Sequence, residues 1–283
     1  MVDLFLAKEL YISIIKNALS EDLGLSGDIT SNAIFADGVK SKAIMRSRAS
    51  GVVSGLSVAA DVFKFCDDSL EVKVLVSDAD KIAEGQDIMI VTGDVKSILL
   101  AERTALNLIS YMSGIATETS RIAEKIKHTS ADLVCTRKTT PGLRVLDKYA
   151  VRCGGAKNHR FNLSDAVLIK DNHIAASGSI LKAVQSVKDN VGHMVKIEVE
   201  VDNLDQLNEL MACDIDIVML DNMDVSTLKE AVSIVDGKFV VEASGGVNVD
   251  NIRSIAETGV DIISCGYITH SSPILDIALD ICN

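Results

Sequence analysis

The feature that most constrains the fold is a regular alternation of short apolar runs with amphipathic helical segments after residue 117. The apolar runs predict six strands, at residues 133–135, 166–169, 195–199, 215–220, 239–243 and 261–265. Alternating strands and helices predict a parallel sheet with right-handed crossovers. Because six strands are fewer than the eight of a closed α/β barrel, we expect an incomplete parallel α/β barrel.

Polar or flexible residues follow each predicted strand at the point where it ends. These residues are Arg137 with Lys138, Lys170, Glu200, Asp221 with Asn222, the run Ser244, Gly245 and Gly246, and Gly266, which Ser264 precedes by two residues. A single charged residue after a strand is usually a solvated loop residue. Since the carboxyl ends of parallel strands meet at one rim of a barrel, the same placement at six strands predicts an active site there.

The segment from Arg137 to Lys170 concentrates positive charge. It carries eight Lys and Arg residues against two Asp, although the whole chain has a net charge of −12. A local positive region on an acidic chain attracts a small polyanion, whereas nucleic acid requires an extended basic face. We therefore expect a small, highly charged anion as ligand and no nucleic-acid partner.

Residue type suggests a role for each group at the rim. The glycine-containing loops at residues 244–246 and 264–266 offer backbone N–H groups to a phosphate. Glu200 and Asp221 could bind Mg²⁺ or ribose hydroxyls through their carboxylates, or could pair with lysines across the barrel when the site is empty. The candidate catalytic residues are Lys138, Lys170, Glu200 and Asp221.

Two histidines belong to the same predicted rim. His159 precedes Arg160 in a loop that follows two glycines, so we favour anion binding over the role of a packed core histidine. His270 is included because it closely follows the turn at Gly266.

The first part of the chain predicts a separate domain, an N-terminal α+β sandwich at residues 1–113. Its start is an amphipathic helix that lacks the pattern of a signal peptide. Its last element is a long helix at residues 94–113 that carries Arg103, which taken alone is an exposed helix arginine. The barrel domain would cover residues 114–271, and a C-terminal helix at residues 272–283 would join the N-terminal domain.

Composition favours the cytoplasm. The six cysteines form no CxxC pair, which favours buried thiols in a reducing compartment. No apolar run approaches the ~20 residues of a membrane span, so we expect no membrane partner. Aromatic residues are only 4% with no Trp, and the resulting aliphatic core fits α/β layers.

Several longer motifs resemble those of the quinolinate phosphoribosyltransferases, the carboxylating nicotinate-nucleotide pyrophosphorylases of NAD synthesis. The motifs are EDLGLSGDIT, AERTALNLISYMSGIAT, TRKTTPGLR, GGAKNHR, LIKDNHI, EVEV, MLDNM, EASGG and GYITHS. The resemblance covers nearly the whole chain. It implies seven barrel strands and a Mg²⁺-dependent transfer from 5-phosphoribosyl-1-diphosphate to quinolinate, which yields nicotinate mononucleotide, diphosphate and CO₂.

The resemblance also implies how the site is divided between the two substrates. The carboxylates of quinolinate would be held by Arg137, His159 and Arg160, with Arg103 from the neighbouring subunit of a homodimer, which can assemble further into a hexamer. The donor would be bound by Lys138 and Lys170, by Glu200 and Asp221 through ribose or Mg²⁺, and by the loops at Ser244 and Gly266 through its 5-phosphate.

Three other functions stay open when the residues are taken without the resemblance. A paralogue of the same fold, such as the molybdenum-associated homologues, would use another acceptor. A phosphosugar aldolase or isomerase could use a lysine at a strand end, but such a lysine needs apolar surroundings and Lys170 is followed by Asp171. A non-catalytic anion sensor would not require six converging segments. The residues themselves predict a barrel enzyme for small polyanionic substrates.

Overall fold

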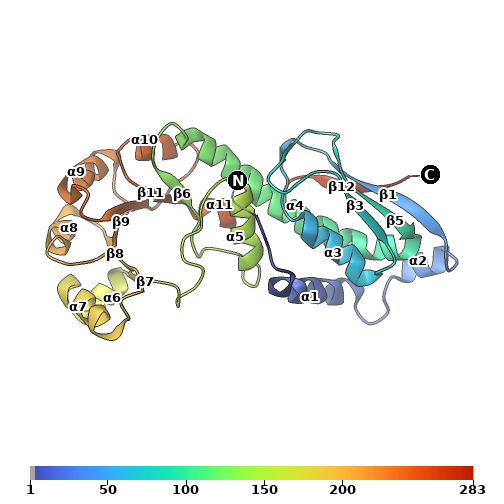
Figure 1. Ribbon diagram of the computed structural model, residues 1–283, viewed down its shortest axis with the longest axis horizontal. Coiled ribbons are helices and arrows are strands. Elements are labelled where there is room, and N and C mark those ends of the chain that lie inside the picture. Colours follow the sequence, from blue (N-terminus) through green and yellow to red (C-terminus); the bar gives the residue numbers. More distant parts are fainter. Residues whose placement is uncertain (1–3, 283) are drawn as a thin grey trace. The chain divides into compact units, whose positions relative to one another are not determined.

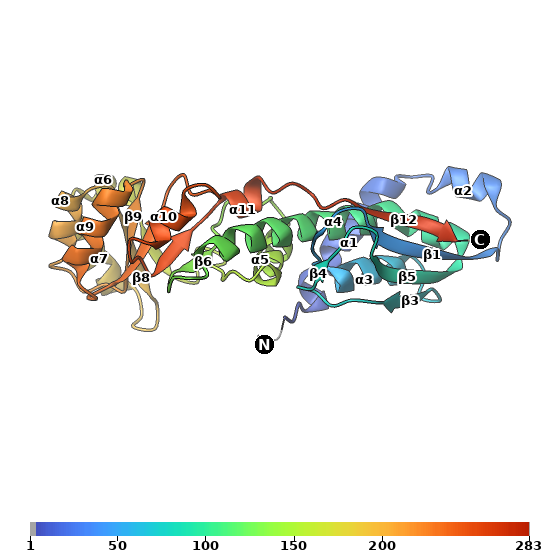
Figure 2. The same ribbon diagram turned by 90° about the horizontal axis from the view of Figure 1, so that it is seen from above.

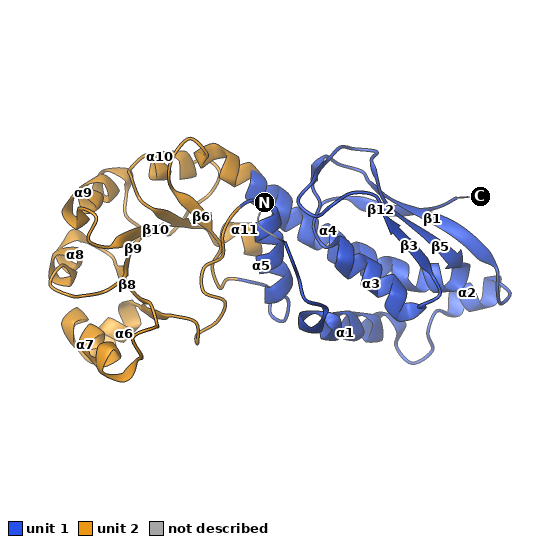
Figure 3. Cartoon of the chain, viewed as in Figure 1, with its two compact units in different colours: residues 1–120, 139–155, 271–283 blue, residues 121–138, 156–270 orange. Residues whose placement is uncertain are grey.

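The computed structural model describes residues 4–282 and divides the chain into two compact units. Unit 1 contains residues 1–120, 139–155 and 271–283, and unit 2 contains residues 121–138 and 156–270 (Figure 3). Helix α4 (Val95–Ile126) continues from the first unit into the second. It therefore extends beyond the helix end predicted at residue 113, because its apolar periodicity does not stop there.

Unit 1 is built on a four-stranded antiparallel sheet with the order β12-β1-β5-β3. These strands are β1 (Lys40–Ser47), β3 (Glu71–Val74), β5 (Asp87–Asp94) and β12 (Ile277–Cys282). A small second sheet pairs β2 (Gly51–Val52) with β4 (Lys81–Ile82). The helices are η1 (Lys8–Leu10), α1 (Ile12–Leu23), α2 (Ile29–Ile34), α3 (Leu56–Cys66), α4, and α5 (Arg144–Cys153). The predicted α+β class of this part is confirmed.

The predicted C-terminal helix at residues 272–283 is wrong. Residues 277–282 form β12, which lies antiparallel beside β1 along six residue pairs (Figures 1 and 2). The sequence alternates Ile277, Leu279 and Ile281 with smaller or polar residues, which is a strand pattern. Close packing holds the segment before it in place, since a Cβ on Gly114 of α4 would lie 2.2 Å from the carbonyl oxygen of Pro273.

Unit 2 is a curved parallel sheet with helices on its outer face (Figure 1). Its six strands have the order β6-β11-β10-β9-β8-β7, namely β6 (Asp132–Val134), β7 (Val167–Ile169), β8 (Ile197–Val201), β9 (Ile217–Asp221), β10 (Val240–Ser244) and β11 (Ile262–Ser264). The helices are α6 (Asp171–Ser177), α7 (Ile180–Asn190), α8 (Leu204–Leu210), α9 (Val225–Val235), α10 (Ile252–Ala256) and α11 (Tyr267–His270). The predicted incomplete parallel α/β barrel is confirmed.

The seventh strand that the resemblance implies is reduced to a single parallel bridge between Val134 and Lys157. It lies between β6 and β7 in the sequence, where the order of the sheet leaves the barrel open. Two backbone hydrogen bonds define it, from Lys157 N to Leu133 O and from Cys135 N to Lys157 O. The bridge leads directly into the loop that carries His159 and Arg160.

Alternation along the strands points polar side chains into the barrel. In β8, Val199 and Val201 are fully buried, whereas Glu198 and Glu200 occupy the other face. Glu200 lines a cavity at the carboxyl ends of the strands. Within residues 4–282, no helix has both the length and the apolar character that crossing a bilayer requires.

Candidate active site

A cavity of about 460 Å³ opens at the carboxyl ends of the unit 2 strands. The structure brings together there most of the residues predicted from the strand ends: Arg137, Lys138, His159, Arg160, Lys170, Glu200, Asp221, Ser244, Gly245, Gly246 and Ser264. Thr136, Leu168, Met219, Asn222 and Glu242 complete its lining. We call this space the cationic cavity, because four Lys and Arg side chains line it.

A second cavity, of about 250 Å³, shares the wall formed by Lys138 and the loop at residues 244–246. Gly266 and His270 lie here rather than in the cationic cavity. A Cβ on Gly266 would come within 2.9 Å of the Lys138 side chain, so glycine lets that lysine pass. The hydroxyl of Thr269 donates to the backbone oxygen of Lys138 at 2.8 Å, which fixes the lysine's main chain beside the two cavities.

Arg103 does not line the cationic cavity. It lies on α4 in unit 1 and borders a separate cavity of about 430 Å³, together with Tyr111, Leu143 and Asp276.

The loop at residues 244–246 has a backbone suited to close approach. Gly245 has φ +94° and Gly246 has φ +61°, a region that side chains other than glycine rarely adopt. A Cβ on Gly245 would lie 2.2 Å from the side-chain oxygen of Asn222, whereas a Cβ on Gly246 would meet nothing within 4 Å. Gly246 thus leaves open space in the cavity wall.

Positive charge gathers on one side of the cavity. Burial, and then the neighbouring guanidinium of Arg137, lower the pKa of Arg160 from its usual value. The guanidinium of Arg160 donates to the backbone oxygen of Ala166 at 2.7 Å, which orients it. Arg137 has a buried Nε atom with no hydrogen-bond partner among the described residues. A buried donor without a partner fits an anionic ligand that accepts from it.

Carboxylates gather on the opposite strands. Glu200 accepts a hydrogen bond from the Lys170 ammonium at 2.5 Å, so the ion pair that the sequence suggested for an empty site is present. Glu200, Asp202 and Asp221 each place one oxygen within 4.8 Å of the others. Oxygen ligands at this spacing fit a hard divalent cation such as Mg²⁺. Asp221 also accepts from the Asn222 side chain at 2.6 Å.

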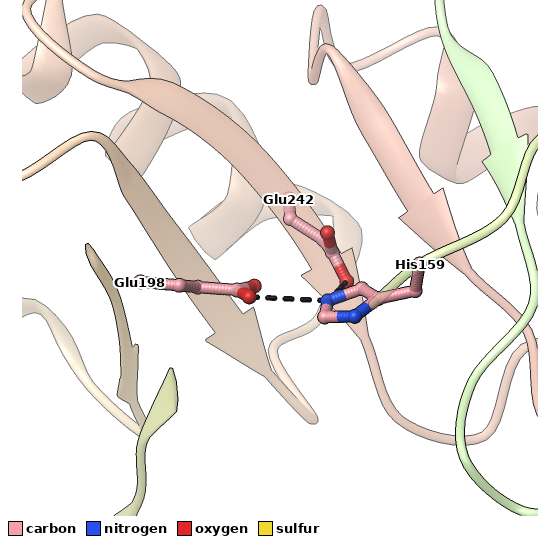
Figure 4. A group of neighbouring side chains, drawn as sticks. All are labelled: His159, Glu198 and Glu242. Atoms are coloured by element: carbon pink, nitrogen blue, oxygen red, sulfur yellow. Dashed lines mark ion pairs between the residues drawn. The ribbon is translucent and has the colours of Figure 1, made fainter. Parts of the chain in front are cut away.

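His159 forms a group with two buried acids, Glu198 and Glu242, which sequence reasoning missed (Figure 4). The Nε2 atom of His159 lies 3.1 Å from Oε2 of Glu198 and 3.6 Å from Oε1 of Glu242. Burial, and then the charge of Glu198, raise the pKa of Glu242 to about 7. The signal was present in the sequence, because Glu198 precedes Glu200 by two residues and Glu242 precedes Ser244 by two, which places them on the same strand faces.

Comparison with known proteins gives a consistent result. The C-terminal domain model of quinolinate phosphoribosyl transferase matches residues 115–280, and the N-terminal domain model matches residues 28–113. A probable nicotinate-nucleotide pyrophosphorylase [carboxylating] of Methanocaldococcus jannaschii is 42% identical over 97% of this chain and 98% of its own. A mitochondrial quinolinate phosphoribosyltransferase [decarboxylating] of Nicotiana tabacum is 40% identical over 95% of this chain and 81% of its own.

Solved structures agree with the sequence matches. The nicotinate-nucleotide pyrophosphorylase of Francisella tularensis superposes with a TM-score of 0.93 at 40% identity, and the alignment covers 98% of both chains.

Proposed function

The chain belongs to the quinolinate phosphoribosyltransferase family, and from that premise we infer that it transfers a phosphoribosyl group to quinolinate with loss of CO₂. The products are nicotinate mononucleotide, diphosphate and CO₂, a step of NAD synthesis. One observation carries this function beyond the family match. A single cavity combines a cationic wall, a pair of carboxylates and a glycine loop, which are the groups that a dianionic acceptor and a phosphorylated donor require.

We assign the cationic wall to quinolinate. Arg137 and Arg160 present planar guanidinium groups, which bind carboxylates through paired hydrogen bonds. The unpartnered Nε of Arg137 supports this assignment. His159 lies in the same wall, but both of its ring nitrogens already contact protein atoms.

We assign the remaining groups to 5-phosphoribosyl-1-diphosphate. Lys138 lines both cavities and can neutralise diphosphate as it leaves. Lys170 lies beside Glu200 at the ribose position. The glycine loop at residues 244–246, with Ser264 and Gly266, binds the 5-phosphate through backbone N–H groups. His270 borders the same space.

We propose that Mg²⁺ acts with the donor. Glu200 and Asp221 would hold the ion, with Asp202 within reach, and the bound ion would neutralise charge on the departing diphosphate. The chain's own part is to place these carboxylates at the ends of neighbouring strands β8 and β9.

The reaction balances without a dedicated acid or base. The ring nitrogen forms a bond to ribose carbon 1 as the bond to diphosphate breaks. The nitrogen is then positively charged and stabilises the electron pair left at carbon 2 when CO₂ departs, and a solvent proton completes the product. The residues that line the cavity bind, orient and neutralise charge.

A phosphosugar aldolase or isomerase is disfavoured by the surroundings of Lys170. A lysine that forms a Schiff base needs an apolar environment to lower its pKa. Lys170 is instead about half exposed and paired with Glu200.

We further propose a homodimer in which Arg103 contributes to the partner's site, with hexamers as a larger assembly. The support is that Arg103 is exposed on unit 1, where it borders a cavity of its own, and is therefore available to a second subunit. Mixing Arg103→Ala subunits with Lys138→Ala subunits should restore part of the activity, because one intact site then forms in each mixed dimer. Recovery that stays absent after verified subunit exchange would place Arg103 outside the site. We also propose a cytoplasmic location, which six free cysteines support.

The function is tested by comparing quinolinate with nicotinate, which lacks the carboxylate at carbon 2. Without that carboxylate a buried cation stays unpaired, so kcat/KM for nicotinate should be lower by ~10⁴-fold. Nicotinate mononucleotide is measured as the common product, with donor and Mg²⁺ present. Lys170→Ala should abolish activity, whereas Lys188→Ala, an exposed lysine of the same unit, should not. Comparable values for the two acids, or no product from quinolinate, would overturn the proposal.

A further inference from the structure

The contacts of the His159 ring show which atoms donate and which accept hydrogen bonds in the group formed by His159, Glu198 and Glu242. The backbone N–H of Arg160 donates to Nδ1 of His159 at 2.8 Å. A backbone N–H is always a donor, so Nδ1 is the acceptor and carries no proton. Nε2 faces two carboxylates and therefore carries the ring proton. His159 is thus a neutral imidazole in the Nε2–H form, and the protein uses both of its nitrogens.

The two carboxylates approach the same N–H from different strands. Figure 4 shows Glu198 on β8 and Glu242 on β10 directed at one ring nitrogen. Their side chains are 5% and 2% exposed, and the His159 side chain is 14% exposed. Strands β8 and β10 are alternate strands of the sheet, and alternate strands supply the side chains of one layer inside a barrel. Both acids therefore lie one layer below the cavity rim.

Each of the two acids has one buried oxygen atom that makes no hydrogen bond to the described residues. The Oε1 atoms of Glu198 and of Glu242 are buried and have no hydrogen-bond partner among the described residues. Buried carboxylate oxygens are usually hydrogen-bonded, because leaving them bare destabilises the fold. An arrangement that keeps two such atoms fits a role in placing His159 better than a role in stability.

Through its contact with Arg160, His159 connects the two acids to the cationic wall of the cavity. Its Nδ1 holds the main chain of Arg160, and the Arg160 guanidinium then donates to Ala166 on the way into β7. The guanidinium lies near that of Arg137, which repels it, while the charge of Glu198 beneath attracts it. The carboxylates, the imidazole and the arginine form one chain of contacts from the barrel interior to the cavity.

We propose that Glu198 and Glu242 are positioning residues for quinolinate binding, which act through the Nε2–H of His159. Glu198 does not line the cationic cavity, and Glu242, which does, has a side chain only 2% exposed. The proposal rests on the proposed function and assigns it two further residues. It also gives His159 a different part from the one the resemblance implies, since the ring orients Arg160 instead of donating to a substrate carboxylate.

Kinetics test the chain of contacts at each link. Glu198→Ala removes the acceptor and should raise KM for quinolinate by about 10-fold, the order of effect that misplaced binding groups have. Glu198→Gln keeps an acceptor oxygen and should stay within about threefold of the parent enzyme, because a neutral hydrogen bond replaces a charged one. KM for 5-phosphoribosyl-1-diphosphate should not change. Glu230→Ala, an exposed acid on α9, is the matched control.

Substitutions of His159 separate its two bonds. His159→Asn can keep an acceptor near the Nδ1 position but loses the contact to the acids, so it should raise KM for quinolinate as Glu198→Ala does. The double variant should be no worse than either single variant, because both break the same chain. Additive effects, or a Glu198→Ala variant with unchanged KM, would overturn the proposal.

A measurement on the parent protein, independent of activity, tests the proposal even if the variants do not fold. Long-range ¹H–¹⁵N correlation spectra of the parent protein distinguish the two neutral forms and the cation of each histidine, and His159→Gln assigns the signal. The Nε2–H form at neutral pH is expected, and the cation or the Nδ1–H form would overturn the proposal. A parent protein that forms no product from quinolinate but shows the Nε2–H form would reject the proposed function alone.

Discussion

Two buried acidic groups, one in each unit, differ in how their oxygens are satisfied. In unit 1, Asp147 of α5 is fully buried and accepts from the hydroxyl of Tyr111 at 2.7 Å and from the backbone N–H of Thr140 at 3.0 Å. In unit 2, the ring nitrogen of His159 lies 3.1 Å from Oε2 of Glu198 and 3.6 Å from Oε1 of Glu242. The Oε1 atom of each glutamate has no hydrogen-bond partner among the described residues. The difference shows that carboxylates buried to the same extent can have different roles. Neutral donors around Asp147 connect elements of the fold, whereas the glutamates orient a side chain of the site.

Burial raises the pKa of one acid in each group, Asp147 in unit 1 and Glu242 in unit 2. Burial raises the pKa of Asp147 to about 6, although its hydrogen bonds from Tyr111 and Thr140 act in the opposite direction. Burial and a neighbouring carboxylate raise the pKa of Glu242 to about 7. Replacing these acids should therefore separate a structural carboxylate from a functional one.

The largest effect on stability is expected for Asp147→Ala. The substitution leaves the Tyr111 hydroxyl and the Thr140 N–H without their acceptor, so the free energy of unfolding should fall by about 3 kcal/mol. Asp147→Asn can accept from Thr140 and donate to Tyr111, and should stay within about 1 kcal/mol of the parent. Urea unfolding measures both. Equal losses in the two variants would break the comparison, because they would show that the charge matters and the hydrogen bonds do not.

A smaller, pH-dependent effect of opposite sign is expected for Glu242→Gln. The folded state holds the Glu242 proton up to about pH 7, whereas the exposed side chain of the unfolded chain loses it near pH 4.5. Below pH 4.5 the titration of this group adds no difference between parent and variant. As the pH rises from 4.5 to 7 the parent loses stability that the variant keeps, and above pH 7 the loss is complete. At pH 8 the variant should be more stable by about 2 kcal/mol.

Thermal or urea unfolding of both proteins between pH 5 and pH 8 tests this, since the remaining carboxylates cancel in the difference. The sign of the stability difference distinguishes the two kinds of acid, because replacing a structural acid would lower the free energy of unfolding at every pH. A stability difference that does not change with pH would contradict it.

The smallest effect is expected at a partly buried acid, Asp78 of unit 1, which resembles Asp147 in its partners. It accepts from the Tyr149 hydroxyl at 2.7 Å and from the backbone N–H of Leu56 at 3.1 Å. Tyr149→Phe removes one of these two bonds, so the free energy of unfolding should fall by about 1 kcal/mol. Urea unfolding at neutral pH measures the change. No loss, or a loss as large as that of Asp147→Ala, would show that a single hydrogen bond to a partly buried acid of unit 1 does not make the expected contribution.

The sequence predicted unit 2 better than unit 1, for a physical reason. Buried parallel strands are short apolar runs between amphipathic helices, so β9 and β10 were placed within two residues of their ends. The C-terminal segment has both helical and alternating apolar spacing, and only its pairing with β1 decides for a strand. Tertiary pairing of that kind cannot be read from a segment by itself.

The position of a residue within its strand also explains which site residues the sequence predicts and which it does not. A charged residue that ends a strand is conspicuous, so Lys170, Glu200 and Asp221 were identified. Glu198 and Glu242 stand inside strands, where a carboxylate is easily taken for a solvent-facing residue. Both side chains in fact point toward His159 inside the barrel (Figure 4). Arg103 was named from the resemblance, and no feature of unit 1 taken alone assigns it a ligand.

The pairing of β12 with β1 has a consequence for synthesis of the chain. Three strands of the unit 1 sheet are made early, but the fourth emerges only after all of unit 2. Until then one edge of β1 presents unpaired backbone groups, which can recruit strands of other nascent chains. Unit 2 has its strands in one continuous run from residue 132 to residue 264 and can be completed first. Translation that stops before residue 277 would release a chain with a finished barrel and an adhesive sheet edge.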